Sequence, residues 1–204
     1  MSSHSDTSTQ IYKYHSIRQM YAGDKLPDLQ LTLREYSKDS VEIEVTNLRY
    51  GIQRWQKMKH ICTIITIYIM YSILASKSWL LFKGHILCDL SFFFWFLYRI
   101  VKLFSLIQSE KVLFCSDLAL QCHTVRFLSR TSNLFIPANN VYDVVINEAI
   151  EDLDVHYVLI IRTKGDLYQK KPIIAIFNTL RPTFDCLHMV YKCLNKARRK
   201  ASTL

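Results

Sequence analysis

The sequence predicts a membrane-anchored α+β protein, in which an apolar helical hairpin is joined to an antiparallel β domain closed by a C-terminal amphipathic helix. Three observations lead to this fold class. Two apolar blocks lie near the middle of the chain, alternating apolar and polar residues occur on both sides of them, and one apolar stripe of helical period lies at the C-terminal end. Half of the 204 residues are hydrophobic and the formal net charge is +9. Outside the hairpin, enough chain remains for one small domain with its own core.

The two apolar blocks predict a membrane helical hairpin over residues 60–104. Residues 61–76 contain no charge, and residues 86–98 contain only Asp89. As a helix, the first block would be about 24 Å long, against a hydrocarbon core of about 30 Å. We therefore expect a hairpin that turns at residues 83–85 and either crosses the bilayer twice or dips in and returns. A pair of buried core helices in a soluble protein is the less favoured alternative.

Basic residues around the hairpin predict its orientation. They are Arg49, Arg54, Lys57 and Lys59 before it, Lys77 and Lys83 at the turn, and Arg99 and Lys102 after it. By the positive-inside rule, this excess at the flanks places both termini in the cytoplasm. The first sixty residues are polar and show no cleavable signal peptide, so the hairpin itself is expected to target the chain to the endoplasmic reticulum membrane.

The part that precedes the hairpin is predicted to contain two segments. Residues 1–28 are expected to be disordered or loosely ordered, because their first part is rich in Ser, Thr and His. Residues 29–59 are expected to form a β-hairpin and a basic juxtamembrane segment. Apolar and polar residues alternate over 29–34 and again over 41–46, on both sides of a Ser-Lys-Asp-Ser turn.

Residues 105–204 are predicted to form a cytoplasmic β domain with a C-terminal helix. Short apolar or alternating runs that predict strands lie at residues 112–114, 118–125, 134–137, 141–146, 155–161 and 173–177. Pro182 suits the first turn of a helix, and an apolar stripe follows at Phe184, Leu187, Tyr191 and Leu194. This order of elements resembles a pleckstrin-homology-like roll.

The sequence offers little for catalysis, cofactors or metals. Six cysteines form no C-x-x-C pair, and the neighbours Cys122 and His123 would point to opposite faces of a strand. The Asp152-Leu153-Asp154 motif fits a solvated acidic loop better than a divalent-metal site beside a nucleotide sugar. No Gly-rich phosphate-binding turn occurs. We therefore expect no catalytic residue, cofactor or metal, and the basic excess without interleaved aromatics argues against nucleic acid.

Residues 143–150, Asp-Val-Val-Ile-Asn-Glu-Ala-Ile, resemble the signature of the PIG-H family, the H component of phosphatidylinositol N-acetylglucosaminyltransferase. Other parts agree with that family in order and spacing. They are the apolar hairpin, residues 109–113, residues 133–136, and Arg181-Pro182 followed by Asp185-Cys186-Leu187 and Tyr191. The resemblance covers roughly residues 60–195.

This resemblance implies a non-catalytic, assembly or stabilising subunit. The implied complex transfers N-acetylglucosamine from UDP-GlcNAc to phosphatidylinositol, which is the first step of glycosylphosphatidylinositol-anchor biosynthesis. The implied partners are the catalytic glycosyltransferase subunit (the A component of the complex), other small membrane subunits of the same complex and endoplasmic reticulum membrane lipid.

Asn147 and Glu148 have two interpretations. They can end a strand, with Asn supplying turn chemistry and Glu facing water, or they can dock on another protein of the complex, as the resemblance suggests. The candidate partner-interface residues are Phe135, Ile136, Asp143, Ile146, Asn147 and Glu148. The alternative function is an autonomous membrane-anchored module that binds anionic lipid headgroups through Arg126, Arg130, Lys164, Lys170 and Lys171. A third possibility, that the chain is itself a transferase, is disfavoured.

Overall fold

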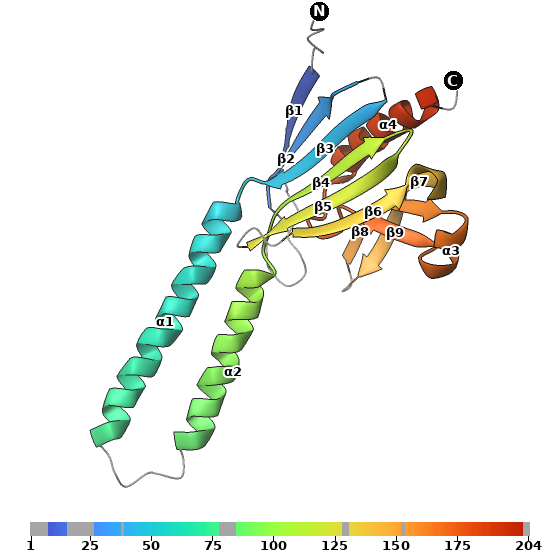
Figure 1. Cartoon of the computed structure of the whole chain (residues 1–204). Helices are drawn as coiled ribbons and strands as arrows, with labels where there is room; N and C mark the ends of the chain where they lie inside the picture. Colours follow the sequence, from blue (N-terminus) through green and yellow to red (C-terminus); the bar gives the residue numbers. More distant parts are fainter. Residues whose placement is uncertain are drawn as a thin grey trace, which may run out of the picture. The chain divides into compact units, whose positions relative to one another are not determined.

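The computed structural model describes residues 8–15, 27–37, 39–77, 85–127, 131–151 and 154–201 (Figure 1). The chain forms two compact units. The sheet unit lies within residues 1–48, 107–125 and 129–204, and the helix unit lies within residues 49–106 and 126–128.

A six-stranded sheet makes up the first part of the sheet unit. Its strands are β1 (Ser8–Tyr14), β2 (Leu29–Glu35), β3 (Ser40–Asn47), β4 (Ile107–Cys115), β5 (Ala119–Arg126) and β6 (Thr131–Pro137). The strands follow one another in chain order across the sheet, so β1 and β6 are its two edges. Antiparallel pairing joins β1 to β2, β2 to β3, β3 to β4 and β5 to β6.

A three-stranded antiparallel sheet follows. It consists of β7 (Val141–Glu151), β8 (Asp154–Thr163) and β9 (Ile173–Ile176), with β8 in the centre. The short helices η3 (Ala138–Asn140) and α3 (Asp166–Lys170) connect strands, and α4 (Phe184–Ala201) is the last helix. The register of β7 against β8 shifts between Val141 and Asp143, which is the mark of a β-bulge.

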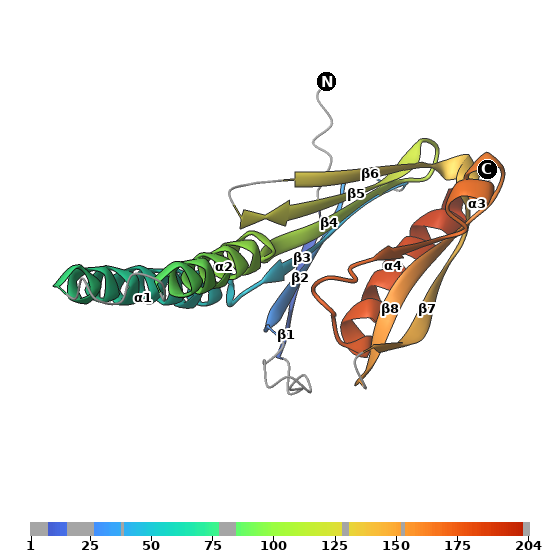
Figure 2. The ribbon, with the colours of Figure 1, turned by 90° about the horizontal axis from the view of Figure 1, so that it is seen from below.

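The core of the sheet unit forms where α4 lies against both sheets (Figures 1 and 2). The apolar stripe of α4 supplies Leu187, Val190 and Leu194, all of which are buried. They join the buried alternating residues of the strands, such as Ile43 and Leu159, in a single hydrophobic cluster. Asp185 lies in the first turn of α4, where the positive end of the helix dipole stabilises an acidic side chain.

Strand β1 lies within residues 1–28, the segment that composition predicts to be loosely ordered. It forms because it pairs along its whole length with β2, whose alternating pattern was already clear in the sequence. Tyr12 and Tyr14 pack against the core, and burial raises the pKa of Tyr14 to about 12. The order of such a polar strand comes from its pairing with β2 rather than from its own composition.

The helix unit contains two antiparallel helices, α1 (Tyr50–Lys77) and α2 (His85–Phe104). The buried side chains of Ile61, Leu103 and Phe127 form a small cluster in this unit. Farther along the pair, the rings of Tyr68 and Phe92 lie 5.7 Å apart. Ile61 of α1 thus lies near Leu103 at the end of α2, and the later Tyr68 lies near the earlier Phe92, as antiparallel packing requires.

The prediction of a membrane-anchored fold with a membrane helical hairpin over residues 60–104 is wrong. Among the described residues, no helix combines the length and the apolar character that crossing a membrane demands. The apolar run at residues 61–76 is only part of α1, whose earlier turns carry Arg54, Lys57 and Lys59. The structure supports an α+β fold with antiparallel sheets. The cytoplasmic placement of both termini depended on the hairpin, and Lys83 and Gly84 of its predicted turn lie outside the described residues.

Many large apolar side chains of the helix unit are nevertheless exposed. They include Ile69, Met70, Ile73 and Leu74 on α1 and Leu87, Phe93, Phe94 and Val101 on α2. Contiguous exposed apolar surface on a protein commonly marks a place where another molecule binds.

Candidate partner interface

Asn147 and Glu148 lie in the interior of β7. The strand continues to Glu151, with Asn147 opposite Val158 and Glu148 opposite Tyr157. The interpretation that these two residues end a strand is therefore wrong. Both are exposed, and because neighbouring residues of a strand point to opposite faces, they present their side chains on different sides of the sheet.

Asp143 shares the face of Asn147 and binds Arg162 of β8. The guanidinium Nε of Arg162 donates to Oδ1 of Asp143 at 2.6 Å, and Nη2 donates to Oδ2. This pair makes the two-pronged contact that a guanidinium favours with a carboxylate. The ring of Tyr142 lies 5.2 Å from the guanidinium carbon of Arg162. Hydrogen bonding to Arg162 lowers the pKa of Asp143. Asp143 is therefore held in place on this face.

Asp143→Asn is expected to cause a small loss of stability that depends on pH. Because the pKa of Asp143 is lower in the folded chain than in the unfolded chain, the ionised carboxylate stabilises the fold above an unfolded-state pKa of about 3.9. This contribution is lost as the pH falls through the folded-state pKa. The loss remains small because the pair is partly exposed.

Urea unfolding of the wild type and of Asp143→Asn at pH 7, 5 and 3 measures this effect. The difference between the two proteins should be largest at pH 7 and should shrink toward pH 3. A difference that grows as the pH falls would contradict the role of the ion pair.

Ile146 lies on the same face of β7 as Glu148, the face toward the core. It is half-buried and packs against the hydrophobic cluster. On the same face, Tyr157 lies with its ring 5.0 Å from that of Phe184 on α4. The structure thus brings Asp143 and Asn147 together on one face of β7 and places Ile146 and Glu148 on the other.

Phe135 and Ile136 are neighbours on β6 with opposite surroundings. Phe135 is 64% exposed, whereas Ile136 is fully buried opposite Leu120 of β5. Only the first of these two side chains is available to a partner, because the second is part of the hydrophobic core.

The candidate headgroup residues do not all lie in one unit. Arg126 is half-buried and belongs to the helix unit, whereas Lys164, Lys170 and Lys171 are exposed in the sheet unit. Arg130 lies outside the described residues. The Nε atom of Arg126 is buried, so part of that guanidinium is withdrawn from solvent.

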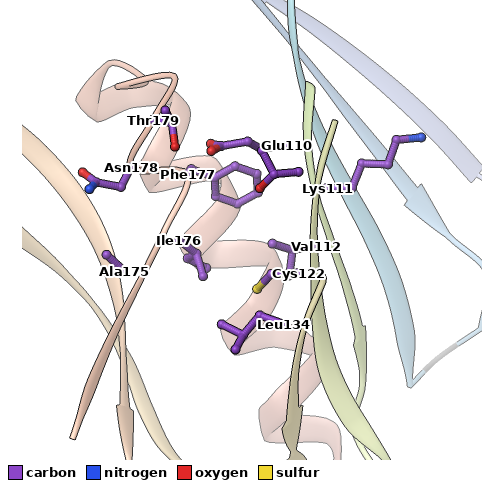
Figure 3. Close-up of a pocket in the computed structure, with 11 residues that line it drawn as sticks. Glu110, Lys111, Val112, Cys122, Leu134, Ala175, Ile176, Phe177, Asn178 and Thr179 are labelled. Atoms are coloured by element: carbon purple, nitrogen blue, oxygen red, sulfur yellow. The ribbon is translucent and has the colours of Figure 1, made fainter. Parts of the chain in front are cut away.

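A pocket with a volume of about 180 Å³ opens inside the sheet unit (Figure 3). One wall comes from β4, β5 and β6, and the other comes from β9 and the turn that follows it. Its lining residues are Glu110, Lys111, Val112, Cys122, Thr124, Leu134 and residues 175–179. Lys111 directs its ammonium away from the pocket, since Nζ lies 3.1 Å from Glu44. Phe177 adopts a left-handed backbone conformation with φ of 56°, which is rare for a bulky side chain.

Two thiols of the sheet unit are expected to be unreactive in the native chain. Burial, together with the negative charge of Glu110, raises the pKa of Cys122 to about 12, and burial alone does the same for Cys186. At pH 8, a thiol with such a pKa is ionised to a fraction of about 10⁻⁴. The thiols of Cys62 and Cys88 are exposed on the helix unit.

Alkylation at pH 8 followed by peptide mass spectrometry measures this difference. Cys122 and Cys186 should react at least about tenfold more slowly than Cys62 and Cys88, because only the thiolate is the nucleophile. In urea, all four should react at similar rates. Native labelling of Cys122 as fast as that of Cys62 would show that the wall of the pocket opens readily.

Within the part of the chain that the structure describes, no group of three or more His, Cys, Asp or Glu residues gathers in a way that could hold a metal ion. Asp152 and Leu153 of the acidic motif lie outside the described residues. One functional candidate was missed in the sequence, namely Arg162, which fixes Asp143. Its signal was the cation directly after the mainly apolar run at residues 155–161.

The fold and these surfaces define an α+β protein of two antiparallel sheets, with edge strands that carry exposed polar and aromatic side chains. Residues 111–178 match the family model described as GPI-GlcNAc transferase complex, PIG-H component. The predicted resemblance to the PIG-H family is thereby confirmed. The matched segment runs from β4 through β9 and contains the candidate residues of β6 and β7.

Three curated relatives agree with the family match. The chain is 31% identical over 100 residues to the H subunit of phosphatidylinositol N-acetylglucosaminyltransferase from Mus musculus, covering 47% of this chain and 53% of the relative. The Homo sapiens and Bos taurus proteins of the same name are 31% and 32% identical over 101 residues, covering 48% of this chain and 54% of each. The chain thus spans about half the length of the curated relatives it matches. No solved structure matches it significantly, so the comparisons give no support to the pleckstrin-homology-like roll.

Proposed function

We propose that this chain is a non-catalytic subunit that assembles or stabilises the complex that transfers N-acetylglucosamine to phosphatidylinositol. The observation that carries the proposal is the family match over residues 111–178, a segment that begins within β4 and contains β5 to β9. The curated relatives, which match about half of this chain, are named as H subunits of the transferase. The catalytic glycosyltransferase subunit is the proposed direct partner.

The proposed contacts of the sheet unit involve exposed candidate residues. Phe135 on β6 and Asn147 and Glu148 on β7 have side chains that a partner can reach without disturbing the core. Asp143 is already bound to Arg162, so it would offer a fixed carboxylate rather than a mobile one. Ile136 and Ile146 instead pack in or against the hydrophobic core and so hold β6 and β7 in place.

The exposed apolar side chains of the helix unit also support an assembly function. Its exposed apolar side chains, such as Phe93 and Phe94, are each 58% accessible to solvent. Burying one such side chain contributes about 2 kcal/mol, so covering several of them would favour association with other proteins of the complex. We propose that these helices contact the other small subunits.

The proposed location is the endoplasmic reticulum, which the family resemblance implies. Fractionation of cells that express the tagged chain, with markers for each compartment, tests this part. Recovery of the chain away from the endoplasmic reticulum markers would contradict it.

Affinity purification in mild detergent tests the assembly function. The full chain is tagged and expressed at its natural level, and the co-purified proteins are identified by mass spectrometry. We expect a glycosyltransferase among them at near-equal amount. Transferase activity should appear in the purified complex and should be lacking in the isolated chain. Repeated recovery of the chain without a glycosyltransferase would refute the proposal.

A further inference from the structure

Strand β6 is an open edge of the six-stranded sheet. Among the described residues, it pairs with β5 only. In an antiparallel edge strand, alternate backbone N–H and C=O groups point away from the sheet, where another extended chain can bind them. The sequence of β6, Thr-Ser-Asn-Leu-Phe-Ile-Pro, contains no charge, and only Pro137 at its end opposes pairing.

Two of the other described edges, β7 and β1, carry features that discourage strand addition. In β7, a β-bulge interrupts the register next to Asp143, and Arg198 of α4 donates a hydrogen bond to the carbonyl oxygen of Tyr142. In β1, Lys13 lies near the end of the strand, and charged side chains on an edge oppose pairing. Edge β6 is therefore better suited than β1 or β7 to accept a strand.

Both faces of the sheet beside β6 have room for the side chains of an added strand. On one face, Phe135 is 64% exposed and offers an aromatic ring beside the edge. On the other face, Leu134 lines the pocket of about 180 Å³ (Figure 3). A cavity of about 150 Å³ is enough to hold benzene, so this pocket can hold an aromatic or large aliphatic side chain.

The pocket lies between the edge strands of the two sheets. Leu134 comes from β6, whereas Ala175 and Ile176 come from β9, the edge of the three-stranded sheet. Val112, Leu134 and Ile176 make much of its wall apolar (Figure 3). An apolar side chain that enters beside β6 would lose its contact with water there, which favours its binding.

We propose that β6 accepts, as an additional strand, an extended segment of the catalytic glycosyltransferase subunit. Backbone hydrogen bonds to the free edge hold this segment. One apolar side chain of the segment enters the pocket beside Leu134, and its neighbour lies on the opposite face beside Phe135. The partner segment is thus extended, with large apolar side chains at two neighbouring positions that point to opposite faces, which fits recognition by β-strand addition. The proposal rests on the proposed function, since the partner belongs to the same complex.

Two substitutions test the proposal in the full chain, co-expressed with the catalytic glycosyltransferase subunit. Phe135→Lys places a charge on the edge, and Thr124→Phe fills the pocket from β5, where Thr124 is half-buried in the pocket wall. Each should lower recovery of the glycosyltransferase by about fivefold or more, as expected for loss of a central contact. The matched control is Ile11→Lys on β1, the opposite edge of the same sheet, where Ile11 is 58% exposed. Recovery with this control should equal that of the wild type.

Hydrogen exchange of the wild-type chain gives an independent measurement. In the complex, the amides of β6 that are not bonded to β5 should exchange more slowly than in the free chain, while those of β1 should be unchanged. Equal exchange of β6 in the free chain and the complex, with normal recovery for both variants, would overturn strand addition but leave the assembly function intact. Failure of the wild-type chain to recover the glycosyltransferase would overturn both.

Discussion

Leu187→Asp is expected to lower the free energy of unfolding of the sheet unit by about 4 kcal/mol or more. Leu187 is fully buried on α4, in the cluster that joins this helix to both sheets. The substitution removes the apolar contacts of a leucine and places a carboxylate where water cannot reach it. A buried charge without a partner is among the few changes that produce such a large effect.

Hydrogen exchange in the full chain measures this loss of stability at individual amides of the sheet unit. The amides of β2, β3 and β8 should lose protection, because these strands share the cluster with α4. Lys192→Asp is the matched control, since Lys192 is exposed on the same helix and receives the same new side chain. Its effect should stay within about 0.5 kcal/mol. Unchanged protection in Leu187→Asp would show that α4 is not part of the core.

Ile136→Ala is expected to destabilise the sheet unit by about 2–5 kcal/mol, whereas Phe135→Ala should change its stability far less. The two residues are adjacent on β6, but Ile136 is fully buried and Phe135 is 64% exposed. Truncation of Ile136 leaves a cavity in the core, while truncation of Phe135 removes contacts only at the surface. Each variant serves as the control of the other.

Urea unfolding and recovery of the catalytic glycosyltransferase together separate the two roles. Ile136→Ala should lower the unfolding midpoint and reduce recovery only to the extent that less folded chain is present. Phe135→Ala should keep the midpoint and still reduce recovery. Loss of stability in Phe135→Ala as large as in Ile136→Ala would show that Phe135 is a core residue, and it would remove this side chain from the proposed interface.

The strands of the sheet unit could largely be predicted because their alternation is a local property. Leu31 and Ile43, for example, alternate with polar residues and are fully buried in β2 and β3. The stripe of α4 was equally clear, since Leu187 and Leu194 recur at helical spacing and are buried. In both cases, one face of the strand or helix is buried. The spacing of its apolar residues therefore predicts whether the segment is a strand or a helix.

The candidate site could be predicted only in part. Exposed Phe135 and buried Ile136 look alike in a sequence, because both are apolar residues of the same short run. Their separation depends on which face of β6 meets the core. Arg162 was missed because its partner Asp143 lies on another strand, and only the register of β7 against β8 brings the two together. The pocket was also missed, since its walls come from two sheets.

The two apolar blocks that suggested a membrane hairpin illustrate the limit of a composition argument. Residues 61–76 are free of charge, but α1 begins at Tyr50 and includes Arg54, Lys57 and Lys59. The ends of a helix depend on backbone hydrogen bonds and packing, so α1 begins well before the apolar run. Helices do form at the positions of the two blocks, but no described helix is long and apolar enough to cross a membrane.

By itself, the sequence determined the α+β composition, the positions of the alternating strands, the amphipathic final helix and the resemblance to the PIG-H family. Only the tertiary structure decided that β1 joins the sheet, that β6 is an open edge beside a pocket, and that Asp143 is bound to Arg162. The physical reason is that periodicity and propensity act between neighbours in the chain. Edges, pockets and ion pairs arise where segments distant in the chain meet, as Ile43 of β3 meets Val112 of β4.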